Sequence, residues 1–305
     1  MVRNPKVQVL LSTYNGQKYL KELMDSVLNQ DFPDIEILVR DDGSSDETLY
    51  VLKRYSGIKN VQILPGENLG AVRSFLKLLQ LSSPNAEYVV FCDQDDVWKE
   101  DKVSRAISIL EKYGNNLPVM YCSRVTIVDE KLKIIGSSQI PRREPAFGNA
   151  LVQNIATGCT IIINNAAQQL ILKKLPSSAM MHDWWIYQVV SAFGKVIYDV
   201  ESRILYRQHS GNMIGEKSSM FLKWRERTRR FLKQGRIQYV TLQAEEFSKI
   251  YGESLPLDKK LILERFINER KTFMGRLRYA FKNETYRQTK VDNIIFRVLI
   301  ILNRI

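Results

Sequence analysis

Short apolar runs alternate with amphipathic stretches along the first hundred residues of the chain. Four runs are rich in Val, Ile and Leu and predict strands buried on both faces: residues 7–15, 35–44, 61–65 and 88–96. Between them, residues 17–30, 44–57 and 70–82 repeat apolar positions at helical spacing, with a Ser cap expected on the second helix and Gly70 opening the third. This alternation predicts a Rossmann-like α/β fold, with a mostly parallel central sheet flanked by helices.

Polar side chains cluster where three of these strands end. Residues 12–15 (STYN) close the first run, Asp41 and Asp42 close the second, and residues 93–96 (DQDD) close the fourth. Functional residues of such sheets gather at the carboxyl ends of the strands. Each piece alone has a simpler interpretation, because STYNG suits an ordinary loop and DDGSSD suits a turn with a helix cap. Three clusters at matching strand ends predict a functional site.

The DQDD stretch places three carboxylates within four positions after an apolar run. Like charges this close repel, and burial raises the cost, so the cluster needs a compensating cation or must face water. Taken alone, a solvated acidic turn before a helix starting near Lys99 is the simpler interpretation.

Composition limits the range of protein classes. A chain of 305 residues that is 45% hydrophobic predicts one large domain, or one domain with an appendage. Cys92, Cys122 and Cys159 are too few and too scattered for a disulfide framework or a zinc site, and we expect them to be small core residues. The N-terminus lacks a signal-like apolar region, and no window is apolar enough to span a bilayer, so we expect a cytoplasmic protein.

Charge divides the chain unevenly. Residues 1–212 hold 24 Lys and Arg against 23 Asp and Glu, whereas residues 213–305 hold 21 against 10. This shift predicts a catalytic domain over residues 1–215 and a basic helical region over residues 216–305.

The ordered motifs resemble those of family 2 glycosyltransferases of the GT-A fold. The resemblance is carried by STYN (12–15), DDGSSDET (41–48), ENLG (67–70) and DQDD (93–96), and it covers about residues 6–212. FCDQDDVW, together with HDWW (182–185) and YRQHSGN (206–212), is similar to bacterial rhamnosyltransferases of polysaccharide synthesis. The resemblance implies inverting transfer of a sugar, most simply L-rhamnose from dTDP-L-rhamnose, onto a lipid-linked surface polysaccharide. A UDP-hexose or UDP-GlcNAc donor is the alternative.

The resemblance also assigns residues to a nucleotide-sugar site. Asp42 would accept a hydrogen bond from the base, and Arg73 would reach the diphosphate unless it is simply a solvated helix residue. The full set expected to bind the nucleotide-diphosphate-sugar donor is Ser12, Thr13, Tyr14, Asn15, Asp42, Asn68, Gly70, Arg73, Asp93 and Gln94.

The same resemblance implies a Mn²⁺ or Mg²⁺ cofactor at the D-x-D motif. Asp95 would be the principal metal ligand, and Asp93 would contact the ribose or a metal-bound water. Asp96 would contact these groups without binding the metal itself. His209 would bind the metal or the diphosphate, or else would be a packed structural histidine. Hard oxygen ligands suit these ions, which would neutralise the departing diphosphate.

An inverting transfer needs a base for the acceptor hydroxyl, and the resemblance places it at Asp183. Trp184 and Trp185 would supply apolar walls that raise the carboxyl pKa, and together with Trp98 would bind the acceptor. The alternative makes Asp183 the N-cap of a helix over residues 184–193. TGCT (157–160) is expected in the acceptor half of the cleft.

The basic C-terminal region predicts a partner of its own. Residues 218–235 combine aromatic and basic side chains in a helical pattern that suits an anionic membrane surface, and residues 294–305 are too short to span. The enzyme would then be peripheral on the inner face of the cell membrane. Alternatively, these helices pack on the catalytic domain or form a homodimer.

Two other function classes fit the sequence less well. A nucleotidyltransferase would need a Gly-rich, Lys-bearing first loop, which is missing. Nucleic acid would be repelled by the acidic cluster, so we expect no nucleic-acid partner.

Overall fold

The computed structural model describes residues 6–209, 238–282 and 284–305. Its larger sheet has seven strands in the order β10-β6-β9-β4-β1-β2-β3. They are β1 (Val7–Thr13), β2 (Ile35–Asp41), β3 (Val61–Pro65), β4 (Tyr88–Cys92), β6 (Val119–Ser123), β9 (Ile162–Asn164) and β10 (Lys195–Asp199). Every pairing is parallel except those of β9, which runs antiparallel to β4 and β6. The predicted mostly parallel sheet is therefore confirmed.

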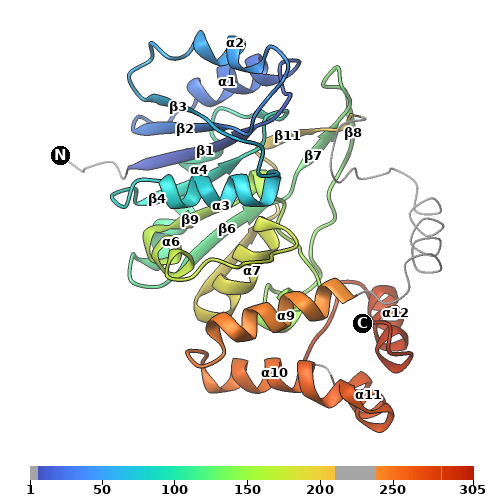
Figure 1. The fold of residues 1–305 in the computed structure, drawn as a ribbon. Coiled ribbons are helices and arrows are strands. Elements are labelled where there is room, and N and C mark those ends of the chain that lie inside the picture. The colour runs from blue at the N-terminus through green and yellow to red at the C-terminus, as the bar shows by residue number, and fades with distance from the viewer. Residues whose placement is uncertain (1–5, 210–237, 283) are drawn as a thin grey trace.

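Helices cover both faces of this sheet (Figure 1). One core joins α3 (Ala71–Leu81), α5 (Phe147–Ala150), α6 (Asn165–Leu172) and α7 (His182–Phe193) to the face that includes Leu10. The other joins α1 (Leu20–Leu28), α2 (Thr48–Lys53) and α4 (Lys102–Leu110) to the face that includes Val9 and Leu11. Successive strand residues point to opposite faces, so uninterrupted apolar strands fill both cores.

A second, smaller sheet lies beside the loop that follows β4. Its strands are β5 (Val97–Trp98), β7 (Thr126–Val128), β8 (Ile134–Ser137) and β11 (Ile204–Arg207), in the order β5-β11-β7-β8. Because β5 pairs with β11, Ile204 and Leu205 lie beside Val97 and Trp98, directly after the DQDD loop. Short 3₁₀ turns occur at Glu111–Tyr113, Gly158–Thr160 and Glu269–Lys271.

The C-terminal helices pack against the α/β region. They are α9 (Gln238–Tyr251), α10 (Leu257–Asn268), α11 (Phe273–Ala280) and α12 (Lys290–Ile301), which lie at the bottom of Figure 1. The ring centroids of Trp185 and Phe247 are 5.7 Å apart, and Asn149 donates a 2.9 Å hydrogen bond to the carbonyl of Tyr286. These helices therefore share a core with α7, and Phe296, Leu299 and Ile300 of α12 belong to it. For residues 294–305 this agrees with packing on the catalytic domain, whereas residues 218–235 lie outside the described residues. The predicted domain boundary at 215 lies outside the described residues and stays a prediction.

Local details confirm some expectations and correct others. Gly70 precedes α3 with φ +79°, a left-handed conformation that favours glycine. The expected Ser cap on α2 is wrong, because the residue before that helix is Glu47 and no side chain caps it. All three cysteines are free and buried, as expected.

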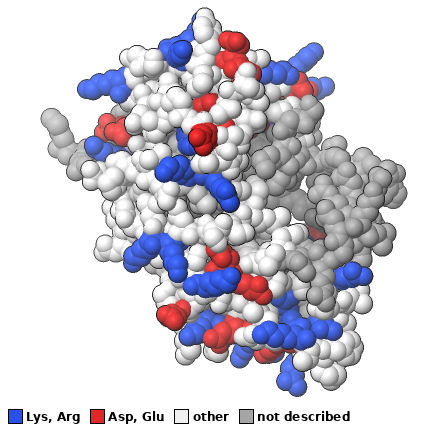
Figure 2. All heavy atoms as spheres, viewed as in Figure 1, with Lys and Arg blue, Asp and Glu red and all other residues white. Residues whose placement is uncertain are grey.

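The basic C-terminal region is only partly described. Residues 213–237 hold 8 Lys and Arg against 2 Asp and Glu, and the predicted helix over 218–235 lies outside the described residues. Figure 2 shows basic and acidic side chains interspersed over the α9–α12 end of the visible face. Within the described ranges, no helix combines the length and hydrophobicity needed to cross a bilayer.

Candidate active site

The ends of β1 and β2 are joined by hydrogen bonds between their polar residues. Thr13 pairs with Asp41 in the parallel register, and its hydroxyl donates to Asp41 Oδ1 at 2.8 Å. The Ser44 amide donates to Asp41 Oδ2 at 2.9 Å. Ser12 Oγ lies 2.7 Å from Ser74 Oγ on α3. Ser12 and Thr13 therefore fix these strand ends, and their contact with a nucleotide stays a prediction.

Asp42 is buried and already bound within the protein. Its Oδ1 accepts from the Leu69 amide and its Oδ2 from the Gly70 amide, both at 2.9 Å, and the Arg40 guanidinium forms an ion pair with it. Its relative exposure is 2%. Asp42 therefore holds the ENLG loop through these two amide hydrogen bonds. The structure does not support the predicted direct contact between Asp42 and a base.

The ENLG loop brings the other predicted residues to the surface. Asn68 and Gly70 are exposed, and Asn68 Oδ1 accepts from the Gly70 amide at 3.1 Å. Arg73 is exposed on the first turn of α3. An exposed guanidinium near a helix N-terminus is compatible with a diphosphate contact and equally with a solvated residue, so both interpretations of Arg73 stand.

Gln94 fastens the DQDD loop to the loop after β1. Its Oε1 accepts from the Tyr14 amide at 2.8 Å, and its Nε2 donates to the Tyr14 carbonyl at 2.9 Å. A Cβ on Gly16 would lie 2.2 Å from Gln94 Oε1, so a larger residue there would displace the Gln94 side chain. Asn15 accepts from the Ser45 amide at 2.9 Å. The Tyr14 side chain is 47% exposed and free to meet a ligand.

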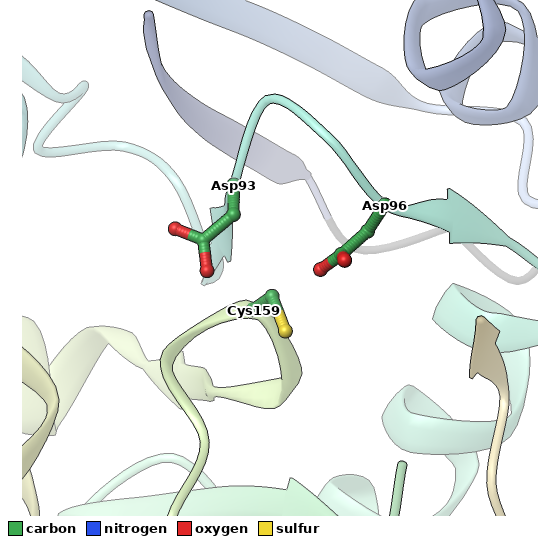
Figure 3. Close-up of side chains that lie close together, drawn as sticks. All are labelled: Asp93, Asp96 and Cys159. Carbon is green, nitrogen blue, oxygen red and sulfur yellow. The ribbon is translucent and has the colours of Figure 1, made fainter. Parts of the chain in front are cut away.

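The DQDD loop carries carboxylates of very different exposure. Asp93 is partly exposed, whereas Asp96 is fully buried. Burial, followed by the charges of Asp95 and Asp183, raises the pKa of Asp93 to about 7. Figure 3 shows Asp93 and Asp96 on either side of the loop, above Cys159. Potential ligand atoms of these three residues lie within 4.8 Å of one another.

Asp95 and His209 meet as the sequence predicted. His209 Nε2 lies 2.8 Å from Asp95 Oδ2, and the His209 ring centroid lies 4.9 Å from that of Tyr19. Both residues line a surface pocket, whose walls are Asn15, Gly16, Lys18, Tyr19, Gln94, Asp95, Glu130 and His209. The structure brings this pair together, while its role as a metal-ligand pair stays a prediction.

The loop suits a hard divalent cation better than a soft one. Within the described residues, no ion pair involves Asp93 or Asp96, and Asp96 Oδ2 is buried without a hydrogen-bond partner. Burial, followed by Asp96 and Asp93, raises the pKa of the Cys159 thiol well above its usual value, so this thiol stays protonated and is a poor ligand. Carboxylates at Asp93 and Asp95 with the His209 nitrogen fit Mg²⁺ or Mn²⁺.

Asp183 lies at the start of α7, close enough to Asp93 to influence its pKa. Burial raises the pKa of Asp183 to about 6, and hydrogen bonds from the Trp184 amide, Asn154 and Gly158 limit the rise. The residue preceding the helix is Met181, so the alternative of Asp183 as the N-cap is wrong. A buried carboxylate of this pKa is suited to accept a proton near neutral pH.

The neighbouring histidine is a packing residue. The His182 ring stacks on Phe75 with centroids 4.1 Å apart, and both ring nitrogens are buried without hydrogen-bond partners. Burial lowers the pKa of His182 to about 3, so the ring is neutral. A Cβ on Gly158 would lie 3.2 Å from His182 Nε2, which places the TGCT segment against this ring.

The three tryptophans predicted to bind the acceptor are buried. Trp185 is 0% exposed and packs on Phe247 and Tyr251. Trp184 donates from Nε1 to the Ala150 carbonyl at 2.6 Å, and the Trp98 ring lies 3.6 Å from the Lys102 ammonium. Buried rings offer a sugar no free face, so the structure does not support their acceptor-binding role. Trp184 and Trp185 instead fix α7 in the core.

Three residues of the site were not predicted from the sequence. Arg40 is the buried ion-pair partner of Asp42, and Asn154 hydrogen-bonds Asp183. Arg207 donates a hydrogen bond to the Asp95 carbonyl in the DQDD loop. Arg40 had a usable signal, because residues i and i+2 of a strand point the same way. Arg207 lies within the YRQHSGN motif, which marked the segment but not its contact with the DQDD loop. Asn154 lies far from Asp183 in the sequence and had no such signal.

The chain is similar in sequence to known glycosyltransferases. The family model described as glycosyl transferase family 2 matches residues 8–170. The dTDP-rhamnosyl transferase RfbG of Shigella flexneri is 28% identical over 96% of this chain and 99% of its own length. An uncharacterized glycosyltransferase, RP339 of Rickettsia prowazekii, is 26% identical over 83% of this chain and 77% of its own.

Solved structures share the fold. Staphylococcus aureus TarS 1-349 in complex with UDP-GlcNAc superposes with a TM-score of 0.59 at 17% identity, covering 98% of this chain and 91% of that one. The mannosyltransferase PcManGT of Pyrobaculum calidifontis, solved with GDP-Man and Mn²⁺, gives a TM-score of 0.54 at 18% identity, covering 90% and 72%. At this identity the likeness establishes the GT-A type of α/β fold alone.

Proposed function

Because the chain belongs to glycosyl transferase family 2, we propose that it is a metal-dependent inverting rhamnosyltransferase. Its donor would be dTDP-L-rhamnose and its acceptor a lipid-linked cell-surface polysaccharide. One observation carries the mechanism: a buried carboxylate, Asp183, with its pKa raised to about 6, lies within electrostatic reach of Asp93 in the DQDD loop. The near full-length similarity to a dTDP-rhamnosyl transferase favours this donor.

In the proposed reaction, the acceptor hydroxyl oxygen attacks the anomeric carbon of the donor sugar. The bond from that carbon to the diphosphate breaks, and Asp183 takes the hydroxyl proton. Hydrogen bonds from the Trp184 amide and Asn154 orient the carboxylate for this transfer. Asp95, Asp93 and His209 would hold Mn²⁺ or Mg²⁺, which when bound would neutralise charge on the departing diphosphate.

The base assignment is tested by Asp183→Asn. Asparagine keeps the size and an acceptor oxygen but cannot take a proton, so turnover should fall by roughly a hundredfold or more. Donor binding should persist, as measured by the thermal shift that the donor produces. A variant with near-normal release of nucleoside diphosphate would show that another group is the base.

The donor is tested by a thermal-shift screen of dTDP-L-rhamnose, UDP-GlcNAc, a UDP-hexose and GDP-mannose, each with and without Mn²⁺. A ligand that binds only the folded state raises its melting temperature by mass action. We expect dTDP-L-rhamnose with Mn²⁺ to give the largest shift. A larger shift with a UDP sugar would favour the alternative donor, to which TarS with its UDP-GlcNAc complex is the structural parallel.

A membrane partner is supported by the exposed surface of α11 and α12. Along α12, Val291, Ile294, Val298 and Leu302 recur at helical spacing and are 47% to 63% exposed. Phe273, Met274 and Phe281 are also exposed, at 58%, 67% and 73%. Residues 271–305 hold 8 Lys and Arg against 2 Asp and Glu. Exposed apolar residues among basic ones suit an anionic lipid surface, where a lipid-linked acceptor would also lie.

Two double variants test this surface. Ile294→Ser with Val298→Ser should weaken co-sedimentation with vesicles containing phosphatidylglycerol. The matched pair Ile134→Ser with Ile135→Ser, on exposed positions of β8, should not. Binding of the parent should decline as salt rises. If the parent ignores these vesicles at low salt and is a dimer that only the α12 variant dissociates, the surface is a homodimer contact.

A further inference from the structure

Arg207, the last residue of β11, is a charged side chain with only 1% exposure. Burying a guanidinium is costly unless its donors are satisfied. Here Nε donates to the Asp95 carbonyl at 2.9 Å, Nη1 donates to the Glu130 carbonyl at 2.7 Å, and Nη2 pairs with the Glu22 carboxylate. The guanidinium also lies 4.4 Å from the centroid of the Tyr19 ring.

These contacts join three separate segments behind the DQDD loop. Glu22 lies on α1, Glu130 lies in the turn between β7 and β8, and Asp95 lies in the loop itself. The backbone amide of Arg207 also donates to Asp96 Oδ1 at 3.1 Å. Two residues later, His209 contacts the Asp95 carboxylate. Asp95 is therefore held at its carbonyl by Arg207 and at its carboxylate by His209.

The charge of Arg207 is directed away from the loop carboxylates. Its ion-pair partner is Glu22, while the loop offers it a backbone carbonyl. Toward Asp96, the contact of Arg207 comes from its backbone amide, which is uncharged. A side chain that acted as a counter-charge would face the carboxylates, so the contacts of Arg207 are those of a geometric clamp.

We propose that Arg207 is a positioning residue that fixes the Asp93–Asp96 loop for binding of the divalent cation and the donor diphosphate. The inference rests on the proposed function, because it presumes that this loop binds both. Arg207 touches neither reactant, and it acts through the Asp95 backbone and the Asp96 carboxylate. Groups that orient ligating residues commonly contribute roughly ten- to a hundredfold to metal affinity.

Geometry and charge can be separated by Arg207→Lys. Lysine keeps the positive charge, but its single ammonium cannot reproduce the planar set of donors that reaches Asp95, Glu130 and Glu22 together. The matched control is Arg203→Lys, just before β11. Among the described residues, the Arg203 side chain hydrogen-bonds Asp101, at 2.7 Å, Glu201 and the Ser202 carbonyl. Both variants leave the net charge of the protein unchanged.

The measurement is calorimetric binding of dTDP, and of UDP in parallel, with and without Mn²⁺. In Arg207→Lys, we expect the Mn²⁺-dependent gain in affinity to shrink by roughly tenfold, while metal-free binding stays within about twofold of the parent. Arg203→Lys should match the parent. An unchanged Mn²⁺ gain in Arg207→Lys would overturn the proposal. So would an equal loss of metal-free and metal-dependent binding, which would mark a purely structural residue.

A second variant covers the case in which Arg207→Lys does not fold. Glu22→Gln changes a carboxylate that is 54% exposed and leaves the guanidinium in place without its outer charge. We then expect the Mn²⁺ gain to fall by about two- to threefold, and an unchanged gain would overturn the proposal. If the parent itself shows no Mn²⁺-dependent nucleotide binding, the proposed function fails instead, which keeps the two failures distinct.

Discussion

Two acidic groups lie at the same edge of the central sheet and are stabilised in opposite ways. The β2 aspartates, Asp41 and Asp42, are satisfied within the protein by Thr13, Ser44, Arg40 and the amides of the ENLG loop. Among the β4 aspartates, Asp93, Asp95 and Asp96, the described residues show no ion pair to Asp93 or Asp96, and His209 contacts the Asp95 carboxylate at 2.8 Å. Burial and mutual repulsion raise the pKa of Asp93 to about 7.

This difference in partners indicates that the β2 aspartates have a structural role and that the β4 aspartates are available to a ligand. A carboxylate whose lone pairs are filled by protein donors has little left to offer a ligand, so the β2 aspartates hold the ends of β1 and β2 and the ENLG loop in place. A cluster that repels itself is relieved by an external cation, so the β4 aspartates are suited to recruit one. The same residue type thus serves two purposes, according to the donors that surround it.

The largest expected effect comes from Asp95→Asn. If the β4 aspartates recruit the cation, this change should abolish transfer and the Mn²⁺-dependent part of nucleotide binding. The fold should stay intact, because removing one of several repelling charges relieves strain. Turnover, measured as release of nucleoside diphosphate, and the melting temperature together test the prediction. Unchanged turnover would place the metal site elsewhere.

The opposite behaviour is expected of Asp42→Asn. It leaves the buried Arg40 guanidinium without its charge partner, so the free energy of unfolding should fall by about 3 kcal/mol. Asp41→Asn is the matched control, because Asp41 makes hydrogen bonds but no ion pair, and about 1–2 kcal/mol is expected for it. Urea unfolding measures both. A more stable Asp42→Asn protein would contradict the scaffold interpretation.

Sequence patterns were sufficient for the main fold and for part of the site. Long apolar strands and their polar ends predicted the parallel sheet, and the family resemblance implied that His209 lies near Asp95. Short elements were not predicted, since β9 has three residues and β5 two, which is too few for a periodic signal. Burial depends on distant packing, so nothing local showed that Trp185 lies beneath Phe247. The clamp at Arg207 joins residues up to 185 positions apart.

A smaller effect is expected from pH, through Asp183. Its pKa is raised from 3.8 to about 6, so it contributes stability below pH 3.8 that is lost as the pH rises through about 6. The metal-free protein should therefore become less stable across that window. Asp183→Asn should make the change smaller but not abolish it, because Asp93 and Asp96 also have raised pKa values. Turnover has the opposite sign, because the base must be ionised, and kcat/KM should fall about tenfold per unit below pH 6. A pH-independent rate across this window would remove Asp183 from the mechanism.

The smallest expected effect comes from Ser74→Ala, which tests whether the two acidic groups are independent. Ser74 is fully buried, lies 2.7 Å from Ser12 Oγ and accepts from Arg40 Nη1 at 2.9 Å. Losing these hydrogen bonds should cost about 1 kcal/mol of unfolding free energy, since Arg40 keeps its ion pair with Asp42.

The same variant tests nucleotide binding. Metal-free dTDP binding should weaken by no more than about twofold, because the ends of β1 and β2 should move only slightly. The Mn²⁺-dependent gain should not change, because no contact of Ser74 reaches the β4 aspartates. A reduced gain in calorimetric titrations would show that the scaffold and the cation site move together, and the separation between them would then fail.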